Sequence, residues 1–353
     1  MDKNNNSKKV NIYYINIKFY YIIILLYAYF YLIIYHKKKP KISVFLPIYN
    51  KENYIINCVR NLQNQTFKDF EIVAINDYSN DTTLEKLSNL AKNDSRIKVI
   101  SNDKNHGLLY SRAMGILNSS GEYLINLDPD DELKDNDSLE YLYNQIKISK
   151  VDIISFSVYN EKLNRIIKCK NDNIIQKQPK IFDSIFNKRK RIREYFIVNK
   201  LIKKEIFLKA YEDFKSEIYN VKWNYFEDDI WSILVNRYAK TKLCVNRLIY
   251  IYNYNKNSLM NKKYGKIEFQ NLLYRHEMYK KLFKSKKDEK YLISEYYFLI
   301  NRLKSNMKSL LLIKDKHIKD NIINIFQFFI SNYKCSKKQR KSINIFLKLI
   351  KQM

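Results

Sequence analysis

The stretch that decides the fold is Tyr123-Leu124-Ile125-Asn126-Leu127-Asp128-Pro129-Asp130-Asp131-Glu132, in which an apolar run ends in a cluster of acids. A continuous apolar run of this length predicts a buried strand. Its end would hold Asp128 and Asp130 at a sheet edge, where alternate side chains point the same way. Clustered carboxylates repel one another, and such hard oxygen ligands suit Mg²⁺ or Mn²⁺, which also bind substrate phosphates. The alternative is an acidic turn before a helix capped by Asp137 or Ser138.

Strand and helix patterns alternate in the residues that precede this stretch. The expected strands are 42–47, 70–76, 97–101 and 122–127, and the expected helices are 54–65, 82–92 and 108–118. This alternation predicts an α/β fold with a mostly parallel sheet flanked by helices. The polar turns at 49–52, 77–81, 102–107 and 128–131 each follow a strand. Since the carboxyl ends of parallel strands share one sheet edge, we expect the four turns to form one binding site.

Two further segments suggest three regions in the chain: a tail with a membrane anchor (1–40), a domain built on the sheet (41–265) and a helical C-terminal region (266–353). The segment from Phe19 to Tyr35 has no charged side chain. As a helix it would span about 25 Å, which is at the short end for crossing a bilayer. We expect an uncleaved transmembrane helix, because no small-residue cleavage site follows it. A buried core helix is the alternative.

The C-terminal region has helical periodicity at 269–282, 291–312 and 317–333. It would form either a cap on the sheet domain or an acceptor platform that also contacts the membrane surface, because Lys-rich amphipathic helices lie on anionic lipid.

The composition limits the possible partners. Lys and Arg number 65 against 36 Asp and Glu, which gives a net charge of +29. This balance attracts nucleic acid, anionic lipid or phosphorylated substrates. No Arg-rich or aromatic-interleaved cluster is present, so we expect no nucleic-acid binding. Four cysteines, Cys58, Cys169, Cys244 and Cys335, lie far apart without metal-ligand spacing, and we expect free thiols partly in the core.

Six stretches, in order, resemble the family 2 glycosyltransferases, which have the GT-A fold. They are VFLPIYNKENYI (44–55), NQTFKDFEIVAINDYSNDTT (64–83), NHGLLYSRAMGILNSSGEYLINLDPDDEL (105–133), NKLIKKEIF (199–207), FEDDIWS (226–232) and YIYNYNKNSLM (250–260). The resemblance implies an inverting hexosyl- or N-acetylhexosaminyltransferase of polysaccharide biosynthesis. Such an enzyme moves one sugar from a nucleotide-diphosphate sugar, expected to be UDP-linked, to a glycan or lipid-linked acceptor.

The resemblance also implies roles for individual residues. Pro47, Tyr49 and Glu52 would hold the nucleotide, Asp77 and Ser79 the uracil-type base, Arg112 the region of the diphosphate, and Asp128 the ribose. Asp128 and Asp130 would bind the Mg²⁺ or Mn²⁺ ion that bridges the phosphates, and Asp228 would be the catalytic base. A carboxylate at position 77 suits this role because it can accept the imide N–H of uracil.

Several features depart from the family pattern or leave alternatives open. Tyr78 replaces the usual Gly of the base-binding loop, and Ala113 replaces the usual Asn. Asp229 leaves open which carboxylate is the base, and acids are favoured at a helix N-terminus in any case. The Gln-x-x-Arg-Trp motif of processive synthases is absent from the sequence, which favours single additions. The alternative functions are a catalytically inactive nucleotide-sugar-binding relative and a basic membrane adaptor.

The sequence also bears on which side of the membrane the enzyme works. Lysines flank the predicted span on both sides, and the run His36–Lys41 after it slightly favours a cytoplasmic catalytic domain by the positive-inside rule. Two Asn-x-Ser/Thr triplets lie in the nucleotide half of the fold, where a glycan would obstruct. The triplets therefore favour a cytoplasmic catalytic domain or a bacterial cell. We expect a single-pass membrane protein whose catalytic domain is cytoplasmic.

Overall fold

The computed structural model describes residues 20–27, 29–30, 39–169, 173–185, 196–220, 222–255, 265–283, 288–313, 315–332 and 337–351. The chain divides into two units, Met1–Pro40 and Lys41–Met353. The predicted transmembrane helix at 19–35 is not supported. Residues 20–27 and 29–30 are helical, but none of the helices in the described ranges is both long and apolar enough to cross a bilayer. The rest of that predicted span lies outside the described residues.

The first four strands follow the predicted alternation. They are β1 (Ile42–Ile48), β2 (Phe70–Asn76), β3 (Ile97–Ser101) and β4 (Tyr123–Asn126), and they pair in the parallel order β3-β2-β1-β4. The connecting helices are α2 (Ile55–Gln63), α3 (Thr83–Asn93) and α4 (Leu108–Asn118). Every residue of β1 is buried, as expected for a parallel strand covered on both faces.

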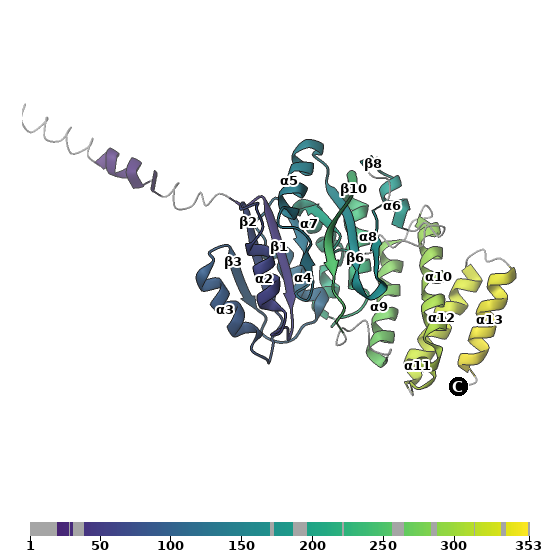
Figure 1. Ribbon diagram of the computed structural model, residues 1–353. Coiled ribbons are helices and arrows are strands. Elements are labelled where there is room, and N and C mark those ends of the chain that lie inside the picture. The colour runs from purple at the N-terminus through teal and green to yellow at the C-terminus, as the bar shows by residue number, and fades with distance from the viewer. Residues whose placement is uncertain are drawn as a thin grey trace, which may run out of the picture. The chain divides into compact units, whose positions relative to one another are not determined.

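The order of the strands reverses between β1 and β4. The chain steps outward from β1 to β3 (Figure 1). It then returns through α4 and places β4 on the other side of β1. Right-handed crossovers therefore put α2 and α3 on one face of the sheet and α4 on the other. The turns after β1 and β4 flank the point of reversal, which is where open α/β sheets bind their ligands.

The second half of the sheet is mixed, and the sequence did not predict it. The strand β9 (Lys200–Lys203) runs antiparallel between β4 and β6 (Ile153–Asn160), and β6 pairs in parallel with β10 (Thr241–Tyr252). The end of β10 pairs with β5 (Glu132–Leu133), directly after the acidic turn. As a result, β10 brings the residues around position 250 back to the acidic turn. The remaining elements here are α5 (Ser138–Ser149), η1 (Glu161–Leu163), β7 (Arg165–Ile167), β8 (Ile175–Lys177) and α6 (Lys180–Ile185).

Two helices, α7 (Lys204–Asn220) and α8 (Glu227–Tyr238), connect the sheet to the C-terminal helices. Helix α4 packs on α7, and α7 packs on α8. The buried Trp231 of α8 contacts the rings of Phe207 and Phe214 in the core that surrounds the sheet. Ile233, two residues later, belongs to a second core formed mainly by the C-terminal helices. Helix α8 therefore contributes to both cores.

The C-terminal region consists of α9 (Lys266–Leu282), α10 (Glu289–Ser305), α11 (Met307–Leu311), α12 (Lys316–Asn332) and α13 (Lys337–Lys351). The predicted helix at 291–312 is divided into α10 and α11, because Asn306 leaves the helical conformation with φ −113° and ψ 21°. Helix α13 was not predicted. Its buried residues, Ile343, Phe346, Leu347 and Ile350, recur at helical spacing and face the second core.

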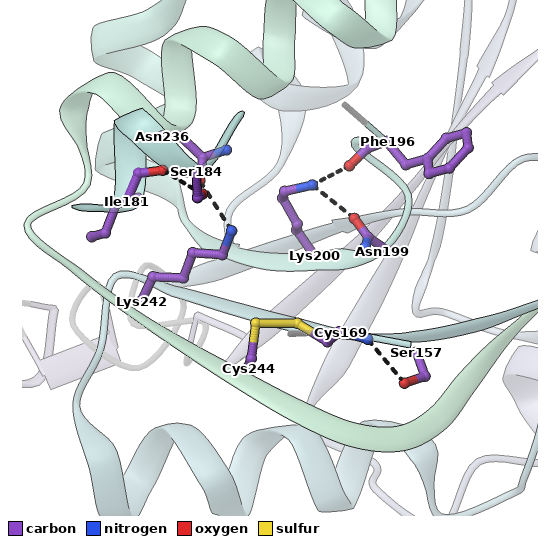
Figure 2. Close-up of a disulfide and its surroundings, with 10 residues drawn as sticks. All are labelled: Ser157, Cys169, Ile181, Ser184, Phe196, Asn199, Lys200, Asn236, Lys242 and Cys244. Carbon is purple, nitrogen blue, oxygen red and sulfur yellow. Dashed lines mark hydrogen bonds between the residues drawn. A yellow bond between two sulfur atoms is a disulfide. The ribbon is translucent and has the colours of Figure 1, made fainter. Parts of the chain in front are cut away.

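The expectation of free thiols is wrong for two of the four cysteines. Cys169 and Cys244 form a disulfide with a Cα–Cα distance of 5.7 Å (Figure 2). After β7 the chain reaches β10, where the amide of Asn173 donates to the carbonyl of Cys244 and β8 pairs with the start of β10. Positions 75 residues apart in sequence thereby become neighbours. Cys58 is a buried free thiol, and Cys335 lies outside the described residues.

Candidate active site

Hydrogen bonds join the turn after β1 to the turn after β2. The amide of Asn50 donates to Ser79 Oγ at 3.0 Å, and the hydroxyl of Thr82 donates to Glu52 Oε2 at 2.6 Å. Glu52 and Ser79, both predicted to bind the donor, therefore fix the two turns against each other. Pro47 is buried within β1, one residue before that strand ends.

Two tyrosine rings are exposed at this edge of the sheet. Tyr49 is 44% exposed and Tyr78 is 59% exposed. The backbone of Tyr78 is left-handed, with φ 60°, a conformation that costs a non-glycine residue about 1–2 kcal/mol. Tyr78 thus adopts the backbone conformation that favours glycine, the residue that the family resemblance leads one to expect at this position. Exposed rings at this edge offer surfaces on which a base can stack.

Asp77 lies beneath the exposed edge and is 3% exposed. Its carboxylate accepts hydrogen bonds from the amides of His106 at 2.9 Å and Gly107 at 2.8 Å, and from Asn102 Nδ2 at 2.8 Å. Asp77 therefore holds the turn after β3, a role that the sequence did not suggest. Its predicted contact with the base stays a prediction. Gly107 is required in this turn because its φ of +93° is strained for any residue with a Cβ.

Asp130 connects three separate segments of the chain. Its Oδ2 accepts from Lys51 Nζ at 2.6 Å and from Asn255 Nδ2 at 2.9 Å, and its carbonyl accepts from Asn253 Nδ2 at 3.1 Å. No role was predicted for Lys51, Asn253 or Asn255. Both asparagines lie in the stretch YIYNYNKNSLM (250–260), whose family resemblance was the available signal.

Asp131, the third acid of the turn, has a structural role. Its carboxylate accepts from Tyr250 Oη at 2.5 Å and from the amide of Asn253 at 2.9 Å. Burial and the nearby charge of Asp128 raise the pKa of Asp131 well above its usual value. The buried pair of Asp131 and Tyr250 fastens the acidic turn to the end of β10.

Arg112 gathers acids from two distant motifs into one buried cluster. Its side chain is 2% exposed. Nη2 donates to Asp128 Oδ1 at 3.1 Å, Nη1 donates to Glu227 Oε1 at 2.8 Å, and Nη1 also contacts Asp228 Oδ1. The guanidinium is oriented by Asn126, whose Oδ1 accepts from Nε at 3.2 Å. The structure therefore brings together three of the predicted site residues, Arg112, Asp128 and Asp228. Arg112 lies beneath the surface of the site, because its side chain is almost fully buried.

The cluster places three carboxylates around one guanidinium, which perturbs their protonation. Burial, together with the charges of Glu227, Asp128 and Asp229, raises the pKa of Asp228 to about 8, although Arg112 opposes the shift. Burial also raises the pKa of Glu227. Because 27% of the Asp228 side chain is exposed, this carboxyl can exchange a proton with a bound molecule. A group with these properties is suited to general acid–base chemistry near neutral pH.

The neighbouring acid Asp229 has a different partner. Its Oδ2 lies 3.1 Å from Nη2 of Arg275, a fully buried residue of α9. Glu227 and Asp228 therefore face α4, whereas Asp229 faces the C-terminal helices. The sequence could not separate Asp228 from Asp229, since adjacent acids in a helix differ only in what surrounds them.

Both predicted metal ligands are partly exposed, as an ion shared with a bound substrate would require. Asp128 and Asp130 keep 24% and 16% of their side chains exposed. Throughout the described part of the chain, no group of three or more His, Cys, Asp or Glu side chains could hold a metal ion. Mg²⁺ is usually bound through one or two carboxylates, with waters and substrate phosphates completing its coordination. Two carboxylates beside a diphosphate would meet that requirement.

Comparisons with known proteins give a consistent assignment. The sequence model of Glycosyl transferase family 2 matches residues 43–211. "Glycosyltransferase GlyG" of Streptococcus pneumoniae serotype 4 is 34% identical over 119 residues, which are 34% of this chain and 39% of that protein. The "GalNAc(5)-diNAcBac-PP-undecaprenol beta-1,3-glucosyltransferase" of Campylobacter jejuni is 31% identical over 176 residues, which are 45% of this chain and 57% of that protein. The chain therefore spans about two-fifths to three-fifths of the length of these relatives.

The fold is also similar to solved structures. The crystal structure of S. aureus TarS 1–349 superposes with a TM-score of 0.57 at 18% identity, covering 81% of this chain and 79% of that chain. The same TarS fragment in complex with UDP-GlcNAc gives a TM-score of 0.57 at 19% identity, covering 82% and 80%. At this identity the likeness establishes the α/β GT-A-like fold.

Proposed function

Because this chain belongs, through residues 43–211, to glycosyl transferase family 2, we propose that it moves a single sugar from a UDP-linked donor to a glycan or lipid-linked acceptor. The proposal includes a hexosyl or N-acetylhexosaminyl donor, inversion at the anomeric carbon and dependence on Mg²⁺ or Mn²⁺. It is supported by the names of the relatives, which include a glucosyltransferase acting on an undecaprenol-linked glycan, and by a neighbour of known structure bound to UDP-GlcNAc.

The observation that carries the proposal is the Arg112 cluster. Arg112 joins Asp128, which follows β4 at the point where the sheet order reverses, to Asp228 at the start of α8. Asp228 lies 116 residues from Arg112 in sequence, so only the fold brings a potential base next to the acids expected to bind the donor. A sugar transferase needs this proximity, because the acceptor oxygen must reach the anomeric carbon while losing its proton.

In the proposed reaction, Asp228 takes the proton of the acceptor hydroxyl as that oxygen attacks the anomeric carbon from the face opposite the nucleotide. The bond between the anomeric carbon and the diphosphate oxygen breaks in the same displacement, and the configuration inverts. The leaving diphosphate gains negative charge near Lys51 Nζ, which lies 2.6 Å from Asp130 and can stabilise that charge. A bound Mg²⁺ or Mn²⁺ held by Asp128 and Asp130 would add Lewis-acid stabilisation of the diphosphate.

A donor screen tests the proposal directly. The full chain would be incubated with UDP-, GDP- and dTDP-sugars, a panel of lipid-linked glycan acceptors and Mn²⁺, and released nucleotide and product would be quantified. We expect turnover with at least one UDP-sugar. Absence of turnover with every donor and acceptor, despite measurable binding of UDP, would favour an inactive nucleotide-sugar-binding relative. The ion pair that ties Asp228 to Arg112 is the observation that favours this alternative.

The protonation of Asp228 predicts how activity depends on pH. A general base works only when deprotonated, and the pKa of Asp228 is raised to about 8 by burial. We therefore expect kcat/KM to rise about ten-fold per pH unit below pH 8 and to level off above it, since this ratio reports the free enzyme. The measurement is the initial rate between about pH 6 and about pH 9.5, a range that brackets the pKa of Asp228. A profile that is flat between pH 6 and 8 would contradict it.

A further inference from the structure

The start of α8 carries three consecutive acids that the structure divides between two arginines. Arg112 contacts Glu227 and Asp228, while Arg275 contacts Asp229. Acids are favoured in the first turn of a helix, but like charges at adjacent positions repel one another. Successive residues of a helix point in directions about 100° apart, so the two arginines approach from different sides. The division therefore depends on α9 as much as on α4.

Arg275 is held rigidly where it meets Asp229. Its side chain is 0% exposed. Nη1 contacts Glu295 of α10, and Nη2 donates to Tyr279 Oη at 2.9 Å. The guanidinium carbon lies 4.1 Å from the centre of the Phe298 ring. That ring contacts Phe226, the residue directly before Glu227. A planar guanidinium fixed on several sides leaves little freedom to the acid it binds.

The same face of α9 also contacts the segment that leads into α8. Asn271 lies one helical turn before Arg275, and its Oδ1 accepts from the amide of Asn224 at 3.1 Å. Asn224 Oδ1 in turn accepts from the amide of Leu108 at 3.1 Å, at the first residue of the helix that carries Arg112. Helix α9 therefore contacts the chain on both sides of Glu227 and Asp228 and connects to α4.

We propose that Arg275 is a positioning residue of the transferase site. From α9 it forms an ion pair with Asp229. This pair leaves Asp228, which faces Arg112, as the acid that takes the acceptor's proton. The inference rests on the proposed function. It makes the C-terminal helical region a part of the catalytic apparatus, in addition to any contact of that region with acceptor or membrane.

The test compares Arg275→Met with its matched control Glu295→Gln in the full chain. Arg275→Met removes the charge that meets Asp229, and we expect kcat for sugar transfer to fall about 10- to 100-fold, the size of effect caused by small misplacements of reacting groups. Because Arg275 pairs with Asp229 and Glu295, whereas the acids expected to bind the donor follow β2 and β4, we expect the dissociation constant of UDP, measured by calorimetry, to change by less than about two-fold. Glu295→Gln removes the charge of the distal partner of Arg275 but keeps an oxygen that can accept from Nη1, and kcat should stay within about two-fold of wild type.

A double substitution distinguishes positioning from a purely structural role. In the Asp229→Asn background, Arg275→Met should lower kcat by less than about two-fold, because the pair is already broken. If Arg275→Met does not fold, Arg275→Met/Glu295→Gln avoids leaving the Glu295 charge buried, and the same comparison applies. A normal kcat with a lowered melting temperature in Arg275→Met would overturn the positioning role of Arg275 but not the proposed function. A wild-type chain that binds UDP but transfers no sugar would overturn the proposed function and, with it, this inference.

Discussion

Asp228→Asn should lower the rate of sugar transfer by about 10²- to 10⁴-fold, the usual contribution of a general base. The affinity for the UDP-sugar should stay nearly unchanged, because the acids expected to bind the donor follow β2 and β4 and are retained. The substitution should not destabilise the fold. Asp228 has a raised pKa because its charge is disfavoured by burial and by Glu227 and Asp128, and Arg112 keeps both of these partners. Single-turnover rates, UDP calorimetry and thermal melting check the three expectations.

Asp229→Asn is the matched control for this substitution, since it removes the same charge one residue away. Its effect on the transfer rate should be no larger than the about 10- to 100-fold expected for Arg275→Met, because it breaks the pair with Arg275 but leaves the Arg112 cluster in place. If the order of the two effects were reversed, Asp229 would be the base. If both substitutions abolished donor binding, the acids of α8 would belong to the donor site instead.

Asp130→Asn should remove turnover that depends on the divalent cation. It takes away one of the two carboxylates proposed to hold the ion, and the amide that replaces it carries no charge. At limiting Mn²⁺ we expect the rate to fall by at least about 100-fold, because the ion supplies several kcal/mol of charge stabilisation in the transition state. The Mn²⁺ concentration needed for half-maximal rate should rise as well. The measurement is a titration of transfer rate with Mn²⁺ at saturating donor.

The control for this prediction is Glu132→Gln, which removes the charge of an exposed acid two residues further along. Its rate should follow that of the wild type over the whole Mn²⁺ titration. Wild-type turnover of Asp130→Asn at limiting Mn²⁺ would show that the carboxylate is a structural partner of Lys51 and Asn255 and that the metal assignment is wrong.

The strands β1 to β4 and the helices between them could be predicted because their signals are local. β2, β3 and α4 begin and end at the residues expected from the sequence, as an apolar run bounded by polar turns specifies a buried parallel strand without knowledge of its neighbours. The antiparallel β9 and the long β10 were missed. Their places in the sheet depend on pairing with strands far away in sequence, and no local pattern encodes such pairing.

The candidate site shows the same division. The sequence determined that Asp77, Asp128 and Asp130 lie at the carboxyl ends of strands, because the change from apolar to polar residues fixes where each strand stops. Only the tertiary structure decided their partners. It buried Asp77 against the turn after β3, joined Lys51 to Asp130 and gave the adjacent acids Asp228 and Asp229 to different arginines.

The physical reason is that the position of a residue along a strand or helix depends on its neighbours in the chain, whereas the charge it meets depends on which elements pack together. Arg112 and Asp228 are separated by 116 residues, and Arg275 reaches Asp229 from a helix of the second core. The protonation and orientation of the proposed base are set by these long-range contacts. The sequence by itself indicated the family resemblance, the first half of the sheet and the edge that carries the site. The packing of α4, α8 and α9 decided which acid there faces which cation.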